Sequence, residues 1–337
     1  MAAVETTIAI STSYEVLTQL DAIKLIAPEW NRLLAESSCN LAFSSAQWFI
    51  ANCDVNPNVQ PHVLIARRDG ILAAVLPLVL NGDVATFPDD ESDYNDMVTA
   101  RDDTAAMTDL LVHALSASAG YPRLILSRLR DDSNCMRSAQ ILKPDALDRP
   151  YTGDTTCPYV RLGSSYEEYL STRSKSFRTS LIQAHNYAER NNVLVRELDP
   201  ESFPAEHLPD VFLSLHLNRF AQETSLSSPP AQSFVRKVFP SLFAERRLRA
   251  FALFEADRIV AISLCMAGAN SLCLWNGGFT RSAERWSPGK LLISAGIKRA
   301  IALRLAEYDF LRGKEAYKSR WANDARDIGQ LEFQIGI

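Results

Sequence analysis

The stretch of sequence that most constrains the fold runs from Trp286 to Trp321. Ser287-Pro288-Gly289 is expected to open a helix, because a proline in the first helical turn loses no hydrogen bond. Apolar residues then recur at helical spacing from Lys290 to Ala306, which predicts one buried helix face. Tyr308 to Leu311 is a short apolar run typical of a buried strand, and a second helix is expected after it. Polar and ionisable residues gather where this strand ends, and open α/β sheets bind ligands at the carboxyl ends of their strands.

Composition limits the class of protein. The chain has 337 residues, 47% hydrophobic and 22% charged, which predicts about two soluble domains. Its net charge of −5 argues against general nucleic-acid binding, so no DNA partner is expected. The N-terminus lacks the pattern of a secretory signal, and no stretch reaches the roughly 18 apolar residues of a membrane span, so we expect a cytoplasmic protein. The six cysteines form no CxxC pair, so we expect free thiols and no metal site.

The first half is expected to contain two strands joined as a hairpin, because Asp69-Gly70 lies between two apolar runs and Asp-Gly favours a tight hairpin turn. The elements expected around it are a strand up to Ser11, a helix within Ser13–Leu34 broken near Pro28, a helix over Phe43–Ile50 capped by Ser44 or Ser45, the hairpin strands His62–Arg67 and Ile71–Val79, short strands at Val84–Phe87 and Met97–Thr99, a helix over Ala105–Ser118, a strand over Arg123–Ser127 and a helix over Ser133–Leu142.

The second half is expected to repeat this order of elements. Lys143 to Pro158 is rich in Pro, Asp, Thr and Gly and is interpreted as a linker, so domains are expected at 1–150 and 151–337. The elements expected after it are a helix opened by the capping pair Ser165 and Glu168, a basic helix ending at Asn191, a strand over Val193–Leu198, a helix over Leu208–Ala221, a further helix after Pro230, and strands over Leu248–Phe254, Ile259–Met266 and Ser271–Trp275. The repeat is one of element order, without clear repetition of residues.

This order resembles the GNAT acyltransferase superfamily, duplicated in one chain. The motifs that carry the resemblance are SKSFRTSLIQAHNYAERNN at Ser174–Asn192, LHLNRF at Leu215–Phe220, SPGKLLI at Ser287–Ile293 and YDFLRGKEAYKSRW at Tyr308–Trp321. They are similar to those of the bacterial CelD-like (BioF2-like) acetyltransferases and, more distantly, of the Fem-type aminoacyl transferases. The resemblance implies an α/β (α+β) fold of tandem GNAT-like domains, each a mixed, mostly antiparallel sheet flanked by helices.

The resemblance also implies one acyl-donor site, in the C-terminal domain, with a degenerate N-terminal domain. Simple GNAT proteins have a Gly-rich phosphate loop, which is shortened here to Trp286–Lys290, and the first half has no comparable loop. The pyrophosphate of coenzyme A suits a helix N-terminus, and backbone N–H groups just past Trp275 could polarise a thioester carbonyl. The residues expected to bind the donor, acetyl-CoA or another acyl-CoA, are Trp275, Asn276, Gly277, Ser287, Gly289, Lys290 and Leu291.

Catalysis needs an acid for the leaving thiolate and a base for the attacking group. Tyr317 is the expected general acid, a role that the resemblance supports, and Glu315, Asp309 or His216 could be the base. Lys318 is a further candidate, for stabilising charge or binding an acidic group. The residues expected to bind the acceptor are Tyr94, Asp96, Lys175, Arg178, Arg219, Arg312 and Trp321. A structural role is the alternative for several of these residues: Asp309 could pair with Arg312 or another buried base, and Tyr317, Trp275 and Trp321 could simply pack.

The expected function is that of an acyl-CoA-dependent N- or O-acyltransferase. Its acceptor, a small molecule, sugar or peptide, would lie between the halves, with Gln222–Pro230 as a lid. One alternative is a Fem-type transferase that uses aminoacyl-tRNA, which is then the only nucleic acid partner. The other is a scaffold protein that keeps the fold without the chemistry.

Overall fold

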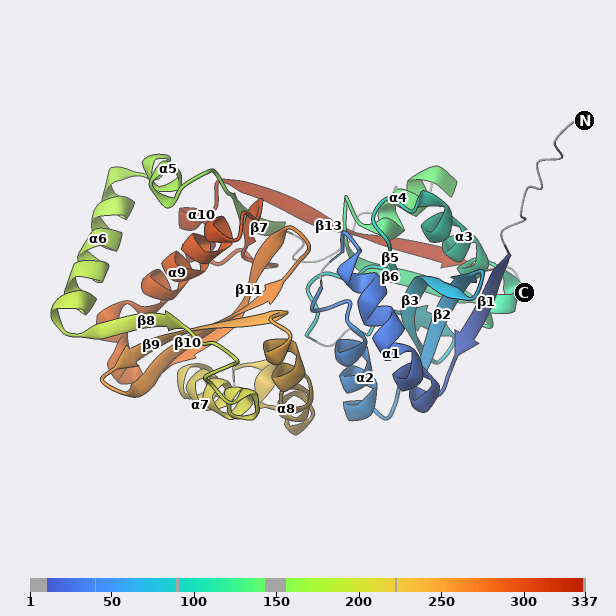
Figure 1. The fold of residues 1–337 in the computed structure, drawn as a ribbon, viewed down its shortest axis with the longest axis horizontal. Coiled ribbons are helices and arrows are strands. Elements are labelled where there is room, and N and C mark those ends of the chain that lie inside the picture. The colour runs from blue at the N-terminus through green and yellow to red at the C-terminus, as the bar shows by residue number, and fades with distance from the viewer. Residues whose placement is uncertain (1–10, 40, 89–90, 143–155, 222, 336–337) are drawn as a thin grey trace, which may run out of the picture.

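One mixed β-sheet joins the two halves of the chain (Figure 1). The computed structural model describes residues 11–39, 41–88, 91–142, 156–221 and 223–335. The strands of the first half are β1 (Thr12–Leu17), β2 (Gln60–Arg68), β3 (Ile71–Asn81), β4 (Val84–Thr86), β5 (Val98–Thr99) and β6 (Arg123–Arg130). Those of the second half are β7 (Thr156–Arg161), β8 (Val193–Glu197), β9 (Leu248–Glu255), β10 (Arg258–Ala267), β11 (Ser271–Phe279), β12 (Glu307–Asp309) and β13 (Asp324–Gln334).

Helices cover both faces of this sheet (Figure 1). Those of the first half are α1 (Leu20–Ala35), α2 (Ala46–Val55), α3 (Thr104–Ala114) and α4 (Asn134–Leu142). Those of the second half are α5 (Tyr166–Ser171), α6 (Lys175–Arg190), α7 (Leu208–Phe220), α8 (Pro229–Ala244), α9 (Pro288–Ala302) and α10 (Ala316–Trp321). The expected order of elements from the hairpin onward is therefore confirmed in both halves.

The two halves have mirrored strand orders. The sheet runs β1-β2-β3-β4-β6-β13-β7-β12-β11-β10-β9-β8, with β5 attached to β3. From either edge inward, four antiparallel strands lead to one parallel pair, β4 with β6 or β11 with β12. In both halves a helix connects the strands of the parallel pair, α3 in the first and α9 in the second. This architecture confirms the tandem fold predicted from the sequence.

One of the innermost strands crosses between the halves. β7, the first strand of the second half, pairs with β12 of the same half. β13 ends the second half, yet its residues Ile328–Gln334 pair with β6, while Asp324–Asp327 pair with β7. Figure 1 shows β13 as one long strand that reaches from one lobe to the other. The sequence did not predict this strand, and it carries the sheet across the domain boundary proposed near residue 150.

Local turn chemistry explains the elements that were predicted well. Asp69 and Gly70 have φ values of 48° and 81°, the left-handed values of a type I′ hairpin turn. The hydroxyl of Ser45 accepts the Trp48 N–H and caps α2, as expected. In the second half Ser165 caps α5, but the Glu168 carboxylate returns to the N–H of Ser164 rather than to that of Ser165.

Three points differ from the prediction. Thr12–Leu17 is a strand that was not expected, and its Thr, Tyr and Val favour the pleated edge beside β2, while the helix expected within Ser13–Leu34 is present as α1. Pro28 lies inside α1 without ending it. Thr156 to Pro158, expected in the linker, belong to β7, while 143–155 and the strand expected before Ser11 lie outside the described residues.

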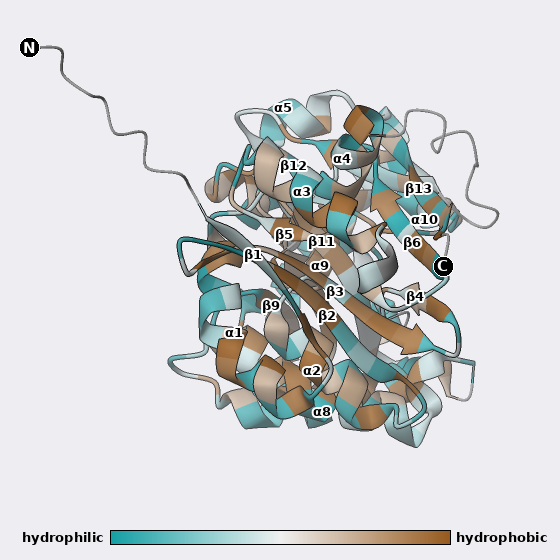
Figure 2. Ribbon diagram, turned by 90° about the vertical axis from the view of Figure 1, so that its right-hand side faces the viewer, coloured by the Kyte–Doolittle hydropathy of each residue, from teal (hydrophilic) through white to brown (hydrophobic). Residues whose placement is uncertain are grey.

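Apolar packing joins the two halves in addition to the pairing of their strands. The Trp48 ring of α2 meets Phe234 of α8 edge to face at 4.8 Å, inside a cluster with residues from both halves. Figure 2 shows hydrophobic residues along β2 and β3, most of which are buried. A continuous hydrophobic interface of this kind opposes independent motion of the halves.

The tightest contact between a helix and the sheet is made at Gly278. A Cβ atom there would lie 2.3 Å from the backbone nitrogen of His216, so α7 packs directly on the backbone of β11. Gly329 of β13 differs, because its nearest neighbour would be the Met136 side chain at 3.6 Å.

We predict that Gly278→Ala lowers the free energy of unfolding by about 1–3 kcal/mol, because two backbones must move apart. Gly329→Ala makes the same chemical change in a strand with room for it and is the matched control. Thermal unfolding of both variants beside the wild type measures the effect. Equal melting temperatures for the two variants would contradict this packing.

Candidate active site

The parallel strands β11 and β12 separate soon after they meet. They pair only from Ser271 to Cys273 against Glu307 to Asp309. Beyond this point they border a hollow of about 770 Å³, here called the C-terminal cleft. Its walls are Leu274–Phe279 of β11, Ser287–Lys290 at the start of α9, Phe310–Arg312 after β12, and side chains from α10 and the end of α7. The cleft therefore lies at the carboxyl ends of two parallel strands, where the sequence predicted a site.

A β-bulge shapes the β11 wall. Leu264 of β10 pairs with Asn276 while Cys265 pairs with Leu274, so Trp275 is an extra residue between them. A bulge takes its extra residue out of the ladder and re-aims the backbone. The Gly277 N–H is already used, because it donates to Asn276 Oδ1 at 2.8 Å. The backbone at Trp275 and Asn276 is thus the better candidate to face a carbonyl group.

The Trp275 side chain has a structural environment. Its indole packs edge to face on Phe239 at 5.3 Å, within the apolar cluster shared by the halves. Its Nε1–H donates to the carbonyl oxygen of Glu91 at 3.1 Å. These contacts support the packing role for the ring, and any contact with a ligand falls to the backbone and the exposed part of the residue.

The start of α9 offers fewer backbone donors than expected. Ser287 has a left-handed φ of 54°, and its carbonyl oxygen accepts the N–H groups of Lys290 and Leu291 at 2.9 and 3.4 Å. Leu291 is also buried in the core and does not line the cleft, so it is removed from the predicted donor-binding set. Gly289, around which a Cβ would meet nothing within 4 Å, and the half-buried Lys290 remain available to an anion.

Lys318 and Glu315 form a pair on the opposite wall. Lys318 is only 4% exposed, and its Nζ donates to the Arg312 carbonyl oxygen and lies 3.0 Å from Glu315 Oε2. Buried lysines need such partners, because an isolated buried charge is costly. Glu315 also reaches solvent, with 56% of its side chain exposed. This pair places one positive and one negative group beside the cleft.

Tyr317 projects from the same short helix, α10, and lines the cleft. Its ring meets that of Phe310 edge to face at 6.3 Å. Desolvation, with the nearby Glu315 carboxylate, raises the pKa of the Tyr317 hydroxyl. A tyrosine hydroxyl is protonated at neutral pH even at its ordinary pKa, which is the state that a proton donor requires, and the raised pKa makes this hydroxyl a weaker acid.

Two arginines and Trp321 complete the lining among the residues predicted to bind acceptor. Arg219 lies over the Phe279 ring at 4.8 Å. Arg312 pairs through Nε with Asp93 Oδ1 at 2.6 Å, so a side chain of the first half reaches the cleft. Trp321 is buried and packs against Phe177 at 4.9 Å, so it forms the floor rather than an open platform.

His216 does not face the cleft. It is buried, and its Nδ1 and Nε2 lie 2.9 Å from the Gly277 carbonyl oxygen and 2.8 Å from the Thr224 hydroxyl. Burial lowers its pKa. With both ring nitrogens engaged, His216 connects α7 to β11 and is withdrawn as a candidate base.

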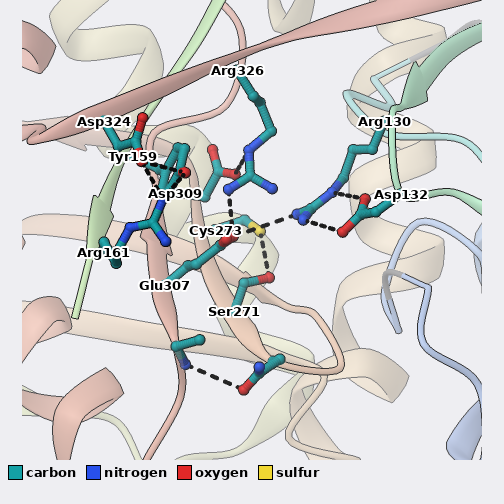
Figure 3. Close-up of polar contacts among 12 residues, drawn as sticks. Arg130, Asp132, Tyr159, Arg161, Ser271, Cys273, Glu307, Asp309, Asp324 and Arg326 are labelled. Carbon is teal, nitrogen blue, oxygen red and sulfur yellow. Dashed lines mark hydrogen bonds and ion pairs between the residues drawn. The ribbon is translucent and has the colours of Figure 1, made fainter. Parts of the chain in front are cut away.

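Asp309 is a structural residue too, although not with the expected partner. It is fully buried and accepts hydrogen bonds from the Tyr94 hydroxyl at 2.9 Å and the Leu311 N–H at 2.7 Å. Its nearest cation is Arg326 of β13, at 3.9 Å from its Oδ2, rather than Arg312 (Figure 3). Burial raises the pKa of Asp309 to about 6, and Arg326 opposes that rise. Asp309 is therefore also withdrawn as a base that acts in the cleft.

The remaining predicted residues lie elsewhere. Lys175 and Arg178 stand on α6, where Arg178 donates to the carbonyl oxygens of Ser171 and Arg173, and neither lines the cleft. Tyr94 and Asp96 line a second hollow of about 360 Å³, with walls from both halves, here called the N-terminal cavity. Asp96 accepts the N–H groups of Met97, Asn134 and Cys135, and burial raises its pKa to about 7.

The loop expected as a lid is anchored. Leu226, within Gln222–Pro230, is fully buried, and Thr224 holds His216. Gln222 itself lies outside the described residues. An anchored loop has little freedom to open, so the lid is withdrawn.

Comparison with known proteins agrees with this geometry. Residues 175–319 match the family model of the acetyltransferase (GNAT) domain. Residues 175–319 therefore form a GNAT-type domain. No curated protein sequence matches the chain. Among the residues that the structure describes, no helix is long and apolar enough to cross a membrane, and no group of three or more His, Cys, Asp or Glu side chains is placed to hold a metal ion.

Solved structures resemble this chain over nearly its whole length. FemX superposes with a TM-score of 0.64 at 11% identity, covering 96% of this chain and 97% of FemX. L-PGS from Bacillus licheniformis gives 0.60 at 14%, covering 91% and 90% of the two chains. A conserved protein of unknown function from Bacteroides thetaiotaomicron gives 0.56 at 10%, covering 97% and 100%. At these identities the likeness concerns the fold.

The charged cluster between the two halves was not predicted from the sequence (Figure 3). Arg326 Nη2 lies 2.6 Å from Glu307 Oε2, and Arg130 Nη1 lies 3.6 Å from the same oxygen. Arg130 also pairs with Asp132 at 2.8 Å. The only clue was the alternation of charged and apolar residues in Asp324–Gln334, which is typical of a strand.

We predict that ionisation of Asp309 makes the fold less stable as pH rises. Its pKa is above that of an unfolded aspartate, so the folded state holds the proton more tightly and loses stability through about pH 6. Asn does not ionise. The unfolding free energy of the wild type minus that of Asp309→Asn should therefore fall by about 2–3 kcal/mol between pH 4 and 7.

Urea denaturation across this pH range measures the difference. Asp83→Asn, on the exposed turn between β3 and β4, is the matched control and should leave the difference constant. A constant difference for Asp309→Asn as well would show that the carboxyl group titrates normally.

Proposed function

We propose that this protein transfers an acyl group from acetyl-CoA or another acyl-CoA to an amine or hydroxyl group. The observation that carries the proposal is the separation of β11 from β12 directly beside the start of α9. The unpaired edge of β11 can hydrogen-bond an extended chain with amide groups, such as the pantetheine arm. The start of α9, with Gly289 and Lys290, then meets the pyrophosphate.

The two halves differ where phosphate would bind. α9 has no acidic residue in its first turn. In the first half, α3 is capped by the Asp103 carboxylate, and the first N–H groups of α4 donate to Asp96. Carboxylates at these helix N-termini repel a pyrophosphate and occupy its donors. We therefore propose one acyl-CoA site per chain, in the domain formed by 151–337, with the domain of 1–150 as its degenerate counterpart.

The transfer step uses residues of the cleft. The acceptor nitrogen or oxygen attacks the thioester carbon, the C–S bond breaks, and backbone N–H groups at the bulge stabilise the negative oxygen. Glu315 accepts the proton of the acceptor directly or through water, and Tyr317 donates its proton to the leaving thiolate. Lys318 holds the Glu315 carboxylate in position through their 3.0 Å ion pair. The acceptor, a small molecule, sugar or peptide, lies near Arg219 and Arg312.

Transfer from aminoacyl-tRNA is the second candidate, favoured by the shared fold with FemX. In that case Lys318, next to Tyr317, stabilises the charge that forms during transfer. Activity that is lost on RNase treatment selects this candidate. A scaffold without chemistry is the third, and it predicts no binding of either donor. We also propose a cytoplasmic location, which fits the six free cysteines of the described chain.

We predict that acetyl-CoA binds with a stoichiometry near one and that Lys290→Ala weakens this binding about tenfold, through the loss of one charged contact with phosphate. Isothermal titration measures both. Lys298→Ala removes a lysine from the same helix outside the cleft, above the Tyr166 ring, and should bind like the wild type. Equal affinities for the two variants would place the phosphate elsewhere, and no binding at all by the wild type would reject the acyl-CoA proposal.

We predict that Tyr317→Phe lowers kcat roughly 10²- to 10⁴-fold, the range for loss of a general acid, with the dissociation constant of acetyl-CoA unchanged. Steady-state kinetics and titration separate the two effects. Tyr187→Phe, on the exposed side of α6, is the control. An unaltered kcat in Tyr317→Phe would remove Tyr317 as the acid.

A further inference from the structure

A short segment of the first half is built into both walls of the C-terminal cleft. We call Glu91–Tyr94 the strap. It lies between β4 and β5 in sequence, but three of its four residues contact the second half. The Glu91 carbonyl oxygen accepts the Trp275 indole N–H at 3.1 Å, and its carboxylate accepts the Ser225 hydroxyl at 2.7 Å.

The strap is held firmly by its own half. Ser92 is 2% exposed, and its hydroxyl accepts the Trp48 indole N–H at 2.9 Å. Its carbonyl oxygen accepts from Arg128 Nη1 at 2.5 Å, and the next residue after the strap, Asn95, donates its N–H to the Arg128 carbonyl oxygen at 3.1 Å. Because both its side chains and its backbone are held by the first half, the strap can hold in place the residues of the second half that it contacts.

On the β12 wall the strap holds the backbone that leads to Tyr317. Tyr94 is 3% exposed and donates its hydroxyl to Asp309 Oδ2, while Asp309 Oδ1 accepts the Leu311 N–H. Leu311 has a φ of 58°, a left-handed conformation that costs a residue with a side chain about 1–2 kcal/mol. The hydrogen bond from Leu311 to Asp309 stabilises that conformation, and Tyr94 orients the Asp309 carboxylate that makes it.

The chain that follows Leu311 carries the catalytic candidates Tyr317 and Lys318. Arg312 follows Leu311, pairs with Asp93 of the strap, and accepts the Lys318 ammonium at its carbonyl oxygen. The direction of the chain at Leu311 and Arg312 therefore sets where α10 begins and where Lys318 and Tyr317 stand. On the β11 wall, the hydrogen bond to the Glu91 carbonyl oxygen holds the Trp275 indole, and with it the bulge at Trp275, in place.

We propose that Asp93 and Tyr94 of the first half are positioning residues for acyl transfer in the second half, and that the strap sets the distance between the bulge and α10. This inference rests on the proposed function of the cleft. Tyr94 touches no reacting atom and acts through Asp309 and Leu311. Misplacement of catalytic groups by about 1 Å can cost 10²-fold in rate.

Tyr94→Phe tests the proposal, since it removes one hydroxyl and keeps the ring. The expected result is a roughly ten- to hundredfold lower kcat with an acetyl-CoA dissociation constant within about twofold of the wild type. Tyr121→Phe is the matched control, because Tyr121 is also buried in the first half and its hydroxyl donates to the Ala114 carbonyl oxygen at 2.9 Å, away from the cleft. It should lower stability comparably and leave kcat unchanged.

Hydrogen exchange gives a readout that needs no substrate. Tyr94→Phe and Asp93→Asn should speed exchange over residues 311–318, and Tyr121→Phe should not. Equal kcat values for Tyr94→Phe and Tyr121→Phe in an active enzyme would overturn the strap proposal. A wild type without activity on any acyl-CoA would reject the proposed function instead, and unchanged exchange over 311–318 would then reject the strap on its own evidence.

Discussion

The antiparallel pairing of β13 with β7 and β6 is the constraint on which the rest of the structure depends. It closes the gap between two half-sheets and brings Arg326 over the Tyr159 ring at 4.0 Å, next to Glu307 and Asp309. Charges buried at this depth are stable only when paired. A shift of β13 by one residue would turn Arg326 away from these carboxylates and expose Leu331 and Phe333, so the cluster and the apolar stripe specify the same register.

The crossing of β13 to the strands of the first half joins the two halves into one unit. β12 is a strand of only three residues, held between β7 and β11. Because β12 pairs with β11 over only three residues, the cleft can form between the two strands. The segment after β12 therefore has little support from the sheet. That support comes instead from Tyr94, Asp93 and the buried Asp309, which explains why a carboxyl group is kept in the core despite a pKa raised to about 6. Burial of the Asp309 carboxyl group costs free energy, but this group holds the backbone at the edge of the cleft in place.

Most of the fold was predictable because its signals are local. Asp69-Gly70 sets its own turn, Ser45 caps its own helix, and the motif from Ser287 to Trp321 contains its helix, strand and second helix in one piece. The same holds for the parts of the candidate site on that motif and on β11, since Lys290, Glu315, Tyr317 and Lys318 all line the cleft. Thr12–Leu17 was missed because its partner β2 begins more than forty residues later, so no nearby residue reveals the pairing.

The failures in the candidate site have the same physical origin. Asp309 was matched with Arg312, its neighbour in sequence, whereas its contacts come from Tyr94, Leu311 and Arg326. His216 was a reasonable base by residue type, but only the packing of α7 on Gly278 shows that both its nitrogens are engaged.

The first half also shapes the C-terminal cleft through direct contacts. The carboxylates of Asp103 and Asp96 accept backbone N–H groups in the first turns of α3 and α4, so these helix N-termini carry negative charge. Its strap nevertheless reaches both walls of the other cleft, and its β6 pairs with the last strand of the second half. A second half cut off from these contacts would expose the β13 edge and the apolar surface around Phe234, and it would release Leu311 from its strained conformation. The two halves therefore form one unit, in which contacts from the first half shape the cleft of the second.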